Sequence, residues 1–163
     1  MSAGDVAELL QGRAAFAAKA VQLAGAARHE LLLRSDALDR TLYGGEDFYN
    51  AVKGFLLGSE RARLCVLVRQ PQQAVHNAQR LIDLGQRLSS RVEFREPGPE
   101  QGELDPVEWL IADRRGLLER RSPESLEAQF WAEEPQRGKL HGEDFDKLWN
   151  EAQPAQELRQ LGI

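Results

Sequence analysis

Few side chains in this sequence could carry out nucleophilic or metal chemistry. The three histidines, His29, His76 and His141, are far apart in the chain, and Cys65 is the only cysteine, so no metal-ligand spacing and no disulfide within one chain is available. Cys65 lies inside the apolar run 64–68 and is expected to be a small buried residue rather than a nucleophile. The motifs G-x-G-x-x-G, G-x-x-x-x-G-K-[ST] and G-x-S-x-G are missing. We therefore expect no metal and no cofactor.

Three arginines follow apolar strand-like segments and are the first candidates for ligand binding. If the segments before Arg34, Arg69 and Arg95 form parallel strands, these side chains emerge at the same carboxyl edge of a sheet, which is where open α/β sheets bind ligands. Guanidinium groups bind carboxylates and phosphates bidentately, so the three arginines predict an anion site. The alternative is that they pair with nearby acids, namely Glu30, Glu93 and Glu96.

His76 and Asp113 complete the set of candidate ligand-binding residues. His76 lies on the helix expected after the second of these strands and could join the anion site if the start of that helix faces it. The alternative for His76 is a surface position. Asp113 begins the tetrapeptide 113–116, which ends in Gly116 and predicts a type I turn in which Asp113 accepts backbone N–H groups.

The elements that must position these residues follow from the spacing of apolar side chains. Amphipathic helices are predicted over 6–27, interrupted near Gly12, and over 46–58, 71–88 and 145–152. Strands are predicted over 30–33, 64–68, 92–95, 107–112 and 126–133, with another beginning at residue 117. Residues 96–105 read as a surface loop. Strands that alternate with helices must pair in parallel, whereas the later hairpin is antiparallel, so we expect a mixed sheet with helices on both faces.

Length and composition limit the number of domains that the chain can form. The chain has 163 residues, 42% of them hydrophobic and 29% charged, which predicts one domain with an N-terminal helix over 1–27, a mixed α/β core over 28–152 and a C-terminal tail over 153–163. Trp131 falls on the charged face of its strand, where it predicts either an interface anchor or packing beneath the C-terminal helix.

The distribution of charged residues indicates which kinds of binding partner to expect. The net charge of −5 argues against nucleic acid as a partner, because phosphate neutralisation supplies most of the affinity of nucleic-acid-binding proteins. The charge is uneven, with −1 over residues 1–59, +4 over 60–95 and −8 over 96–163. The basic middle segment predicts either a local anion site or an ordinary solvated surface. No stretch is long and apolar enough for a membrane span, and no signal peptide is evident, so the cytoplasm is the expected location.

Three segments carry a resemblance to known families. Residues 81–92, residues 109–113 and the helix containing Phe145 and Trp149, with the ending 157–163, resemble a bacterial family of unknown function whose members occur alone or behind an N-acetyltransferase domain. The order of elements, the apolar strand ending in Asp113 and this last helix also resemble one half-unit of the phospholipase D-like fold. Enzymes of that fold use H-x-K-x-x-x-x-D, in which histidine attacks phosphorus or protonates the leaving group and lysine holds the phosphate.

The motif is missing from this sequence. With Asp113 at the aspartate position, Pro106 stands at the histidine and Glu108 at the lysine, and no H-x-K occurs elsewhere. Asp113 would then be a relic of the catalytic strand that orients another polar group. The resemblance implies a non-catalytic, phospholipase D-like interaction or anion-sensing module, and it also implies a homodimer. The alternatives are an accessory partner of an N-acetyltransferase and a nucleic-acid-binding protein acting through the basic middle segment.

Overall fold

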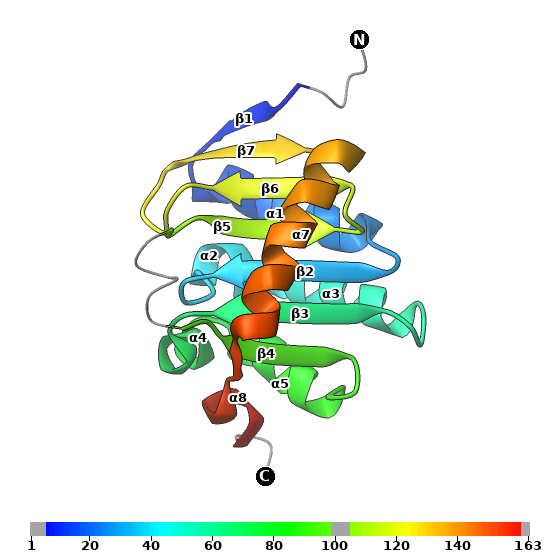
Figure 1. The fold of residues 1–163 in the computed structure, drawn as a ribbon, viewed down its shortest axis with the longest axis vertical. Coiled ribbons are helices and arrows are strands. Elements are labelled where there is room, and N and C mark those ends of the chain that lie inside the picture. The colour runs from blue at the N-terminus through cyan, green and yellow to red at the C-terminus, as the bar shows by residue number, and fades with distance from the viewer. Residues whose placement is uncertain (1–5, 99–104, 161–163) are drawn as a thin grey trace.

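An eight-stranded mixed sheet runs through the computed structural model, which describes residues 6–98 and 105–160 (Figure 1). The strands follow the order β1-β7-β6-β5-β2-β3-β4-β8. The predicted mixture of parallel and antiparallel pairing in an α/β fold is confirmed.

The parallel part of the sheet comes from the first half of the chain. Strands β2, β3 and β4 pair in parallel, as strands joined by helical crossovers must. The sequences of β2 and β3 are mainly apolar, which suits burial on both faces, whereas β4 alternates the buried Val92 and Phe94 with Glu93 and Arg95. The elements of this half are β2 (Glu30–Ser35), α2 (Arg40–Tyr43), α3 (Glu46–Leu57), β3 (Arg63–Val68), α4 (Pro71–Asn77), α5 (Gln79–Arg87) and β4 (Val92–Glu96).

The antiparallel part is joined to β2. Strand β5 pairs antiparallel with β2, and β6, β7 and β1 continue the sheet from it in antiparallel pairs, while β8 pairs with the opposite outer strand, β4. The strands are β1 (Glu8–Gln11), β5 (Glu108–Ala112), β6 (Gly116–Arg120), β7 (Glu127–Trp131) and β8 (Gln153–Pro154). Because β5 runs against β2, the end of β5 lies beside the beginning of β2, which decides where Asp113 is placed.

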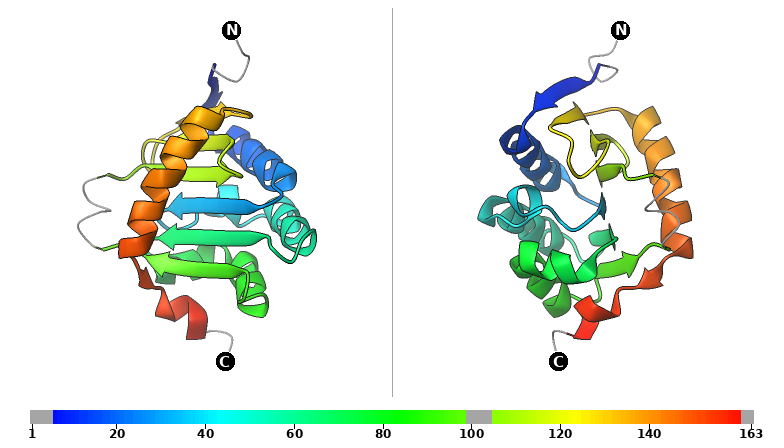
Figure 2. Two further views of the ribbon diagram at one scale, coloured as in Figure 1. Left: turned by 45° about the vertical axis from the view of Figure 1, so that its right-hand side comes forward. Right: turned by 90° about the vertical axis from the view of Figure 1, so that its left-hand side faces the viewer.

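Helices cover both faces of the sheet, as predicted (Figure 2). Helices α1 (Arg13–Ala26) to α5 lie on one face, and α8 (Gln156–Gln160) packs against α4 and α5. Helix α7 (Pro135–Glu151) crosses the other face diagonally. The apolar core is divided accordingly, and the smaller cluster beneath α7 contains Phe145, Trp131 and Trp109. No helix in the described parts of the chain combines the length and apolar character needed to cross a lipid bilayer.

The predicted helix over 6–27 is wrong for its first turns. Residues Glu8–Gln11 form β1, and the helix starts only after Gly12, at the interruption that the sequence indicated. Gly12 has φ 85, a left-handed conformation that glycine adopts without steric cost. Leu10 is buried whereas Leu9 is 71% exposed, which is the alternation of an outer strand. Helical and strand spacing are hard to distinguish over so few residues.

Three other boundaries differ from the sequence prediction. The helix predicted over 71–88 is two helices, because Ala78 has φ −140 and ψ 49 and interrupts it. The last helix begins at Pro135 instead of residue 145, since its first turns contain Gly138 and Gly142 rather than large apolar side chains. Residues 153–160 form β8 and α8 rather than a plain tail. Of the predicted loop 96–105, residues 99–104 lie outside the described residues.

Candidate functional site

The three predicted arginines do reach the carboxyl edge of the parallel strands. In the strand register Arg34 lies opposite Leu67, and Leu67 lies opposite Arg95, so Arg34 and Arg95 are two strands apart on the same sheet face. Arg69 directly follows β3. The strand register alone therefore places all three near one edge, but their side chains divide into two groups.

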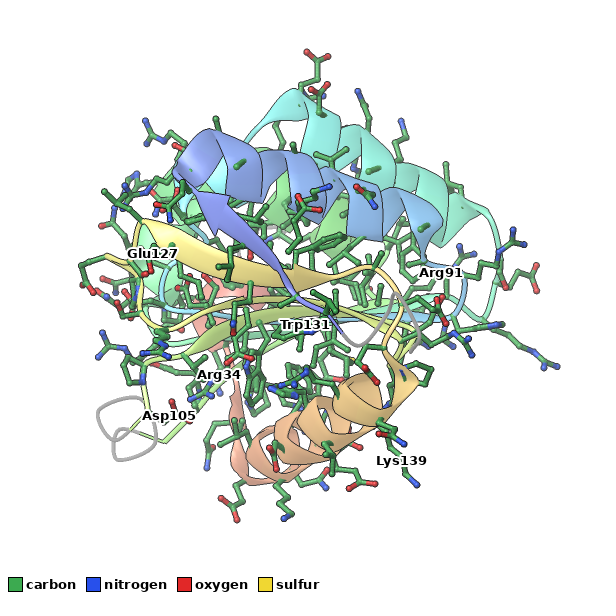
Figure 3. All side chains as sticks on the ribbon, turned by 90° about the horizontal axis from the view of Figure 1, so that it is seen from above. Arg34, Arg91, Asp105, Glu127, Trp131 and Lys139 are labelled. Atoms are coloured by element: carbon green, nitrogen blue, oxygen red, sulfur yellow. The ribbon has the colours of Figure 1, made fainter. Side chains whose placement is uncertain are left out.

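Arg34 and Arg69 line a small cleft with a volume of about 150 Å³. The cleft lies between the ends of β2 and β3, the segment that enters β5 and the turn after β6. Figure 3 shows Arg34 and Asp105 side by side at this edge. The other lining residues in the described part of the chain are Ser35, Asp36, Leu67, Pro97, Pro106, Val107, Ser122, Pro123 and Glu124.

Arg34 is nearly buried, with 8% of the residue exposed, and its guanidinium is incompletely bonded. Its Nη2 donates to the backbone oxygen of Asp105 at 2.6 Å, and the guanidinium carbon lies 5.0 Å from the Trp109 ring centre. Its buried Nη1 has no hydrogen-bond acceptor among the described residues. The Asp105 carboxylate lies 3.5 Å from Nη1, which is an ion-pair distance but long for a hydrogen bond. Burial lowers the pKa of Arg34, and the charges of Asp105 and Glu108 act against that shift.

Arg69, by contrast, is neutralised within the protein. Its Nε donates to the Asp36 carboxylate at 2.6 Å, and Gln70 donates to the other oxygen of the same carboxylate at 2.8 Å. Asp36 follows β2 directly, so its side chain reaches across to the end of β3. Arg69 therefore contributes less free positive charge to the cleft than Arg34 does.

Behind the cleft, Glu108 is held in a buried ion pair. Its carboxylate accepts from Arg120 Nε at 3.0 Å and from the Asp36 backbone N–H at 2.8 Å, and it is 3.3 Å from the Ser35 hydroxyl. Glu108 and Arg120 are each less than 5% exposed. The position that the motif spacing assigns to lysine thus holds a carboxylate with its own internal cation. Pro106, at the position assigned to histidine, lines the cleft itself.

Arg95 lies outside the cleft. Its guanidinium lies 4.3 Å from the ring centre of Trp149 on α7 and donates to the Trp149 backbone oxygen at 2.8 Å. Its Nε also contacts Glu93 at 2.6 Å. For Arg95, pairing with a nearby acid is therefore what the structure shows, and its contact with α7 is a packing interaction.

His76 and Asp113 do not line the Arg34 cleft. His76 is exposed in the last turn of α4, away from the start of that helix. Asp113 lies at the opposite edge of the sheet, where its carboxylate accepts from the backbone N–H groups of Arg28, His29 and Glu30 at 2.9, 2.8 and 2.9 Å. Asp113 thus accepts backbone N–H groups as predicted, but they belong to the start of β2 rather than to its own turn.

The type I turn predicted at Asp113 is wrong. Asp113 and Arg114 both have φ 54, and the Arg115 N–H donates to the Ala112 carbonyl at 2.9 Å. Left-handed conformations at both central positions belong to the hairpin turn called type I′, which matches the twist of the paired strands. Asp113 tolerates this conformation better than most residues, because its short polar side chain can bond to nearby backbone groups.

Trp131 is buried, with 3% exposed, under α7. Figure 3 shows it between the sheet and that helix. Of the two predictions for Trp131, packing beneath the C-terminal helix is confirmed, and its use as an exposed interface anchor is wrong.

Asp36, Asp105 and Ser122 are cleft residues that the sequence reasoning missed. Asp36 carried a usable signal, since it lies two residues after Arg34 at a predicted strand end. Asp105 and Ser122 carried none, because they enter the cleft only through the pairing of β5 with β2 and β6.

Comparisons with known proteins bear on the fold. A family model described as Domain of unknown function (DUF7931) matches residues 12–161. A search of curated proteins found no match. Among solved structures, the chain is similar to TrmBL2, an archaeal chromatin protein described as showing a novel mode of DNA binding, with a TM-score of 0.68 and 16% identity. That likeness covers 91% of this chain and 54% of TrmBL2, so the chain spans about half the length of that protein.

Two smaller proteins match over nearly their whole length. Nuc from Salmonella typhimurium, described as a phospholipase D family member, has a TM-score of 0.60 and 9% identity over 91% of this chain and 98% of its own. NucT from Helicobacter pylori has a TM-score of 0.61 and 8% identity over the same shares, 91% and 98%. At these identities the likeness establishes a shared fold and nothing about activity.

Proposed function

This chain belongs to the family described as Domain of unknown function (DUF7931) and has a phospholipase D-like fold, and from these premises we propose that it is a non-catalytic interaction module. Its cleft, in this proposal, binds a carboxylate through Arg34. The carboxylate belongs either to a small molecule or to the end or an acidic side chain of a partner protein.

The observation that carries the proposal is the free Nη1 of Arg34. A buried polar group without a hydrogen-bond partner costs about 1–3 kcal/mol, and more when it is charged. Asp105 is a weak internal partner, because its side chain is 61% exposed and its carboxylate is 3.5 Å away. An entering carboxylate would displace that contact and bond to Arg34 with better geometry.

The motif positions support a non-catalytic role. Phosphoryl transfer by this fold depends on a neutral histidine and a fixed cation beside it. None of the described residues lining the cleft is a histidine, and Pro106 stands at the position assigned to it. Glu108 at the lysine position is neutralised by Arg120 and would repel a phosphodiester.

The size and charge of the cleft favour a carboxylate over a phosphate. Asp36, Asp105 and Glu124 all line it, and their charges disfavour a dianion more strongly than a monoanion. A volume of about 150 Å³ equals the share of about five water molecules in the liquid. That is room for one small anionic group rather than for a nucleotide.

A titration followed by NMR of the backbone amides tests the proposal. Acetate should shift the signals of Ser35 and Asp36 saturably, and inorganic phosphate should shift them less. Arg34→Gln should abolish the effect, whereas Arg95→Gln, at the same sheet edge but outside the cleft, should retain it. Asp105→Asn should strengthen binding because it removes the internal competitor, and this variant keeps the test decisive if Arg34→Gln fails to fold.

Two peptide probes distinguish the sources of the carboxylate. A short peptide with a free C-terminus that binds more tightly than acetate, while its amidated form does not bind, would indicate a protein partner. Equal binding of acetate and peptide would indicate a small-molecule ligand. Acetate shifts that persist in Arg34→Gln would overturn the proposed site.

Hydrolysis of bis-p-nitrophenyl phosphate tests the non-catalytic part. We expect no hydrolysis above the buffer rate. Activity that is lost in the Asp113→Ala variant would contradict the proposal. The homodimer, the cytoplasmic location and the association with an N-acetyltransferase stay predictions.

A further inference from the structure

A second pocket, remote from the Arg34 cleft, opens on the helical face between α3 and α5. It has a volume of about 590 Å³ and is lined by Tyr49, Arg80, Asp83, Gln86 and Arg87. Tyr49 comes from α3 and the other lining residues come from α5. Arg80 and Arg87 belong to the segment 60–95, whose net charge is +4.

Cations surround the side chain of Tyr49 in this pocket. Arg87 Nη2 donates to the Tyr49 hydroxyl at 3.0 Å. The guanidinium carbon of Arg80 lies 4.2 Å from the ring centre, and the ammonium of Lys53 lies 6.0 Å from it. Lys53 is four residues after Tyr49, so both side chains lie on the same face of α3.

The electrostatic balance at this position is positive. The hydrogen bond from Arg87 lowers the pKa of Tyr49, and the charges of Arg87, Lys53 and Arg80 add to that effect, while burial of the ring opposes it. Among the described residues that line the pocket, Asp83 is the acidic one. Within the described part of the chain, no ion pair joins Asp83 to Arg80 or Arg87 at 4.0 Å or less, so the arginines keep their charge available for a ligand.

The cations are arranged in a row rather than around one point. Helix α5 rises about 1.5 Å per residue, so Arg80 and Arg87 lie about 10 Å apart along its axis and on the same face. Arg91, in the turn after α5, lies beside the end of α3, where its Nη1 donates to the Leu56 carbonyl at 2.7 Å. A single phosphate group cannot bridge these positions, whereas a phosphodiester backbone carries negative charge at short regular intervals.

We propose that the surface formed by Lys53, Arg80, Arg87 and Arg91 binds the sugar-phosphate backbone of nucleic acid without reading its sequence. Arg80 already covers the Tyr49 ring, so the ring is not available to stack on a base. The binding is therefore electrostatic, and it is independent of the carboxylate cleft proposed above.

The net charge of −5 describes the whole chain and not this surface. The total of −5 predicts no affinity for nucleic acid only if the charges are mixed over the surface. Residues 96–163 carry −8, and they include α7, which covers the other face of the sheet (Figure 2). A polyanion on the α3–α5 face therefore has the sheet between it and α7, and the part of residues 96–163 that shares its face is α8, which packs against α4 and α5.

Fluorescence anisotropy with a short labelled DNA duplex tests the proposal. Wild-type affinity should fall steeply as salt is raised, and Arg80→Glu/Arg87→Glu should weaken binding at least about tenfold and reduce the log–log salt slope by about 2. The matched control is Lys139→Glu/Lys147→Glu, which makes the same charge change on exposed positions of α7 and should bind within about twofold of the wild type.

A second double variant and a competition with phosphate complete the test. Lys53→Glu/Arg80→Glu leaves the Arg87–Tyr49 bond intact and should show a similar loss if the first variant fails to fold. Inorganic phosphate at the same ionic strength as sodium chloride should compete no better than chloride. Absence of binding at low salt, an equal loss in the α7 control, or a loss of DNA binding in Arg34→Gln instead would overturn the proposal.

Discussion

Arg34 and Arg95 lie in register on β2 and β4, the two parallel strands on either side of β3, yet only Arg34 lines the cleft. Arg95 packs on Trp149 and bonds to the backbone of α7, whereas Arg34 lies beside the segment that enters β5. The residue types and their positions near the ends of parallel strands could be predicted from the sequence. The groups that each guanidinium contacts could not be predicted, because those groups belong to segments that are distant in the chain.

Cys65 offers a prediction about reactivity. Burial, together with the charges of Glu93 and Glu30, raises the pKa of the Cys65 thiol to about 11. At pH 8 only about one molecule in a thousand then carries the reactive thiolate. Iodoacetamide should modify the native protein at least about tenfold more slowly than the urea-unfolded chain. Equal rates, measured by mass spectrometry, would contradict this environment.

His141 offers a prediction about pH. Its Nε2 lies 3.0 Å from a Glu119 carboxylate oxygen, and its Nδ1 lies 3.0 Å from the Arg137 carbonyl. Only the protonated ring donates to both. The bond to Glu119 accordingly raises the pKa of His141, although burial opposes the shift.

The raised pKa of His141 determines how its contribution to folding stability changes with pH. A raised pKa in the folded state stabilises the protein fully below the ordinary value of about 6.5, and this stabilisation is lost as pH rises through the folded-state pKa. The wild type should therefore be more stable than His141→Gln in urea at pH 6, and the difference should shrink by pH 9. A difference that grows with pH would exclude a protonated His141.

At the scale of elements, α7 approaches the β5–β6 hairpin closely through two glycines. A Cβ at Gly138 would overlap the backbone of Arg114, and one at Gly142 would lie 2.8 Å from Arg114 Nη1. Arg114 is itself clamped by Glu30 and by both oxygens of Asp146, the latter at 2.9 Å. Helix α7 therefore packs directly against the β5–β6 turn, through backbone contact at Gly138 and through the ion pairs of Arg114.

Two glycine substitutions test this close packing of α7 on the β5–β6 turn. Gly138→Ala should destabilise the fold by about 1–3 kcal/mol or more, because backbone atoms cannot yield as a side chain can. Gly54→Ala, in the middle of α3, meets nothing within 4 Å and should stabilise by about 0.5–1 kcal/mol through helix propensity. Urea unfolding of both variants measures the contrast, and equal effects would refute the close approach.

The sequence predicted elements well where the apolar pattern was long and poorly where other forces decided. The core strands β2, β3 and β5 appeared as apolar runs because most of their residues on both faces are buried, whereas β4 buries mainly Val92 and Phe94 on one face. The first turns of α7 had no such pattern, since glycines rather than large apolar residues make their contacts. The apolar spacing of residues 8–11 resembled that of a helix, but these residues form strand β1 because they pair with β7.

At the scale of the whole molecule, one sheet connects strands from both ends of the described chain. Strand β1 is paired with β7, and β8 is paired with β4, so segments distant in sequence share one ladder of hydrogen bonds. The single domain stays a prediction, and we expect the strands of this sheet to unfold as one cooperative unit.

Equilibrium unfolding checks that prediction. Tryptophan fluorescence reports mainly on the layer beneath α7, where all three tryptophans contribute to the smaller core cluster, and far-ultraviolet circular dichroism reports on all helices. The two signals should give coincident urea transitions with one midpoint. Separate midpoints would show that the layers on the two faces of the sheet unfold independently.

The sequence by itself determined the class of fold and the lack of one motif. Alternation of apolar strands with amphipathic helices requires parallel pairing, and the lack of any H-x-K is a matter of residue identity alone. Tertiary structure alone decided the sites. It placed Asp113 at the edge opposite Arg34, because β5 runs antiparallel to β2, and it gathered the cations of α3 and α5 around Tyr49. Local spacing specifies the face on which a side chain lies, whereas its neighbours depend on contacts between segments that are distant in the chain.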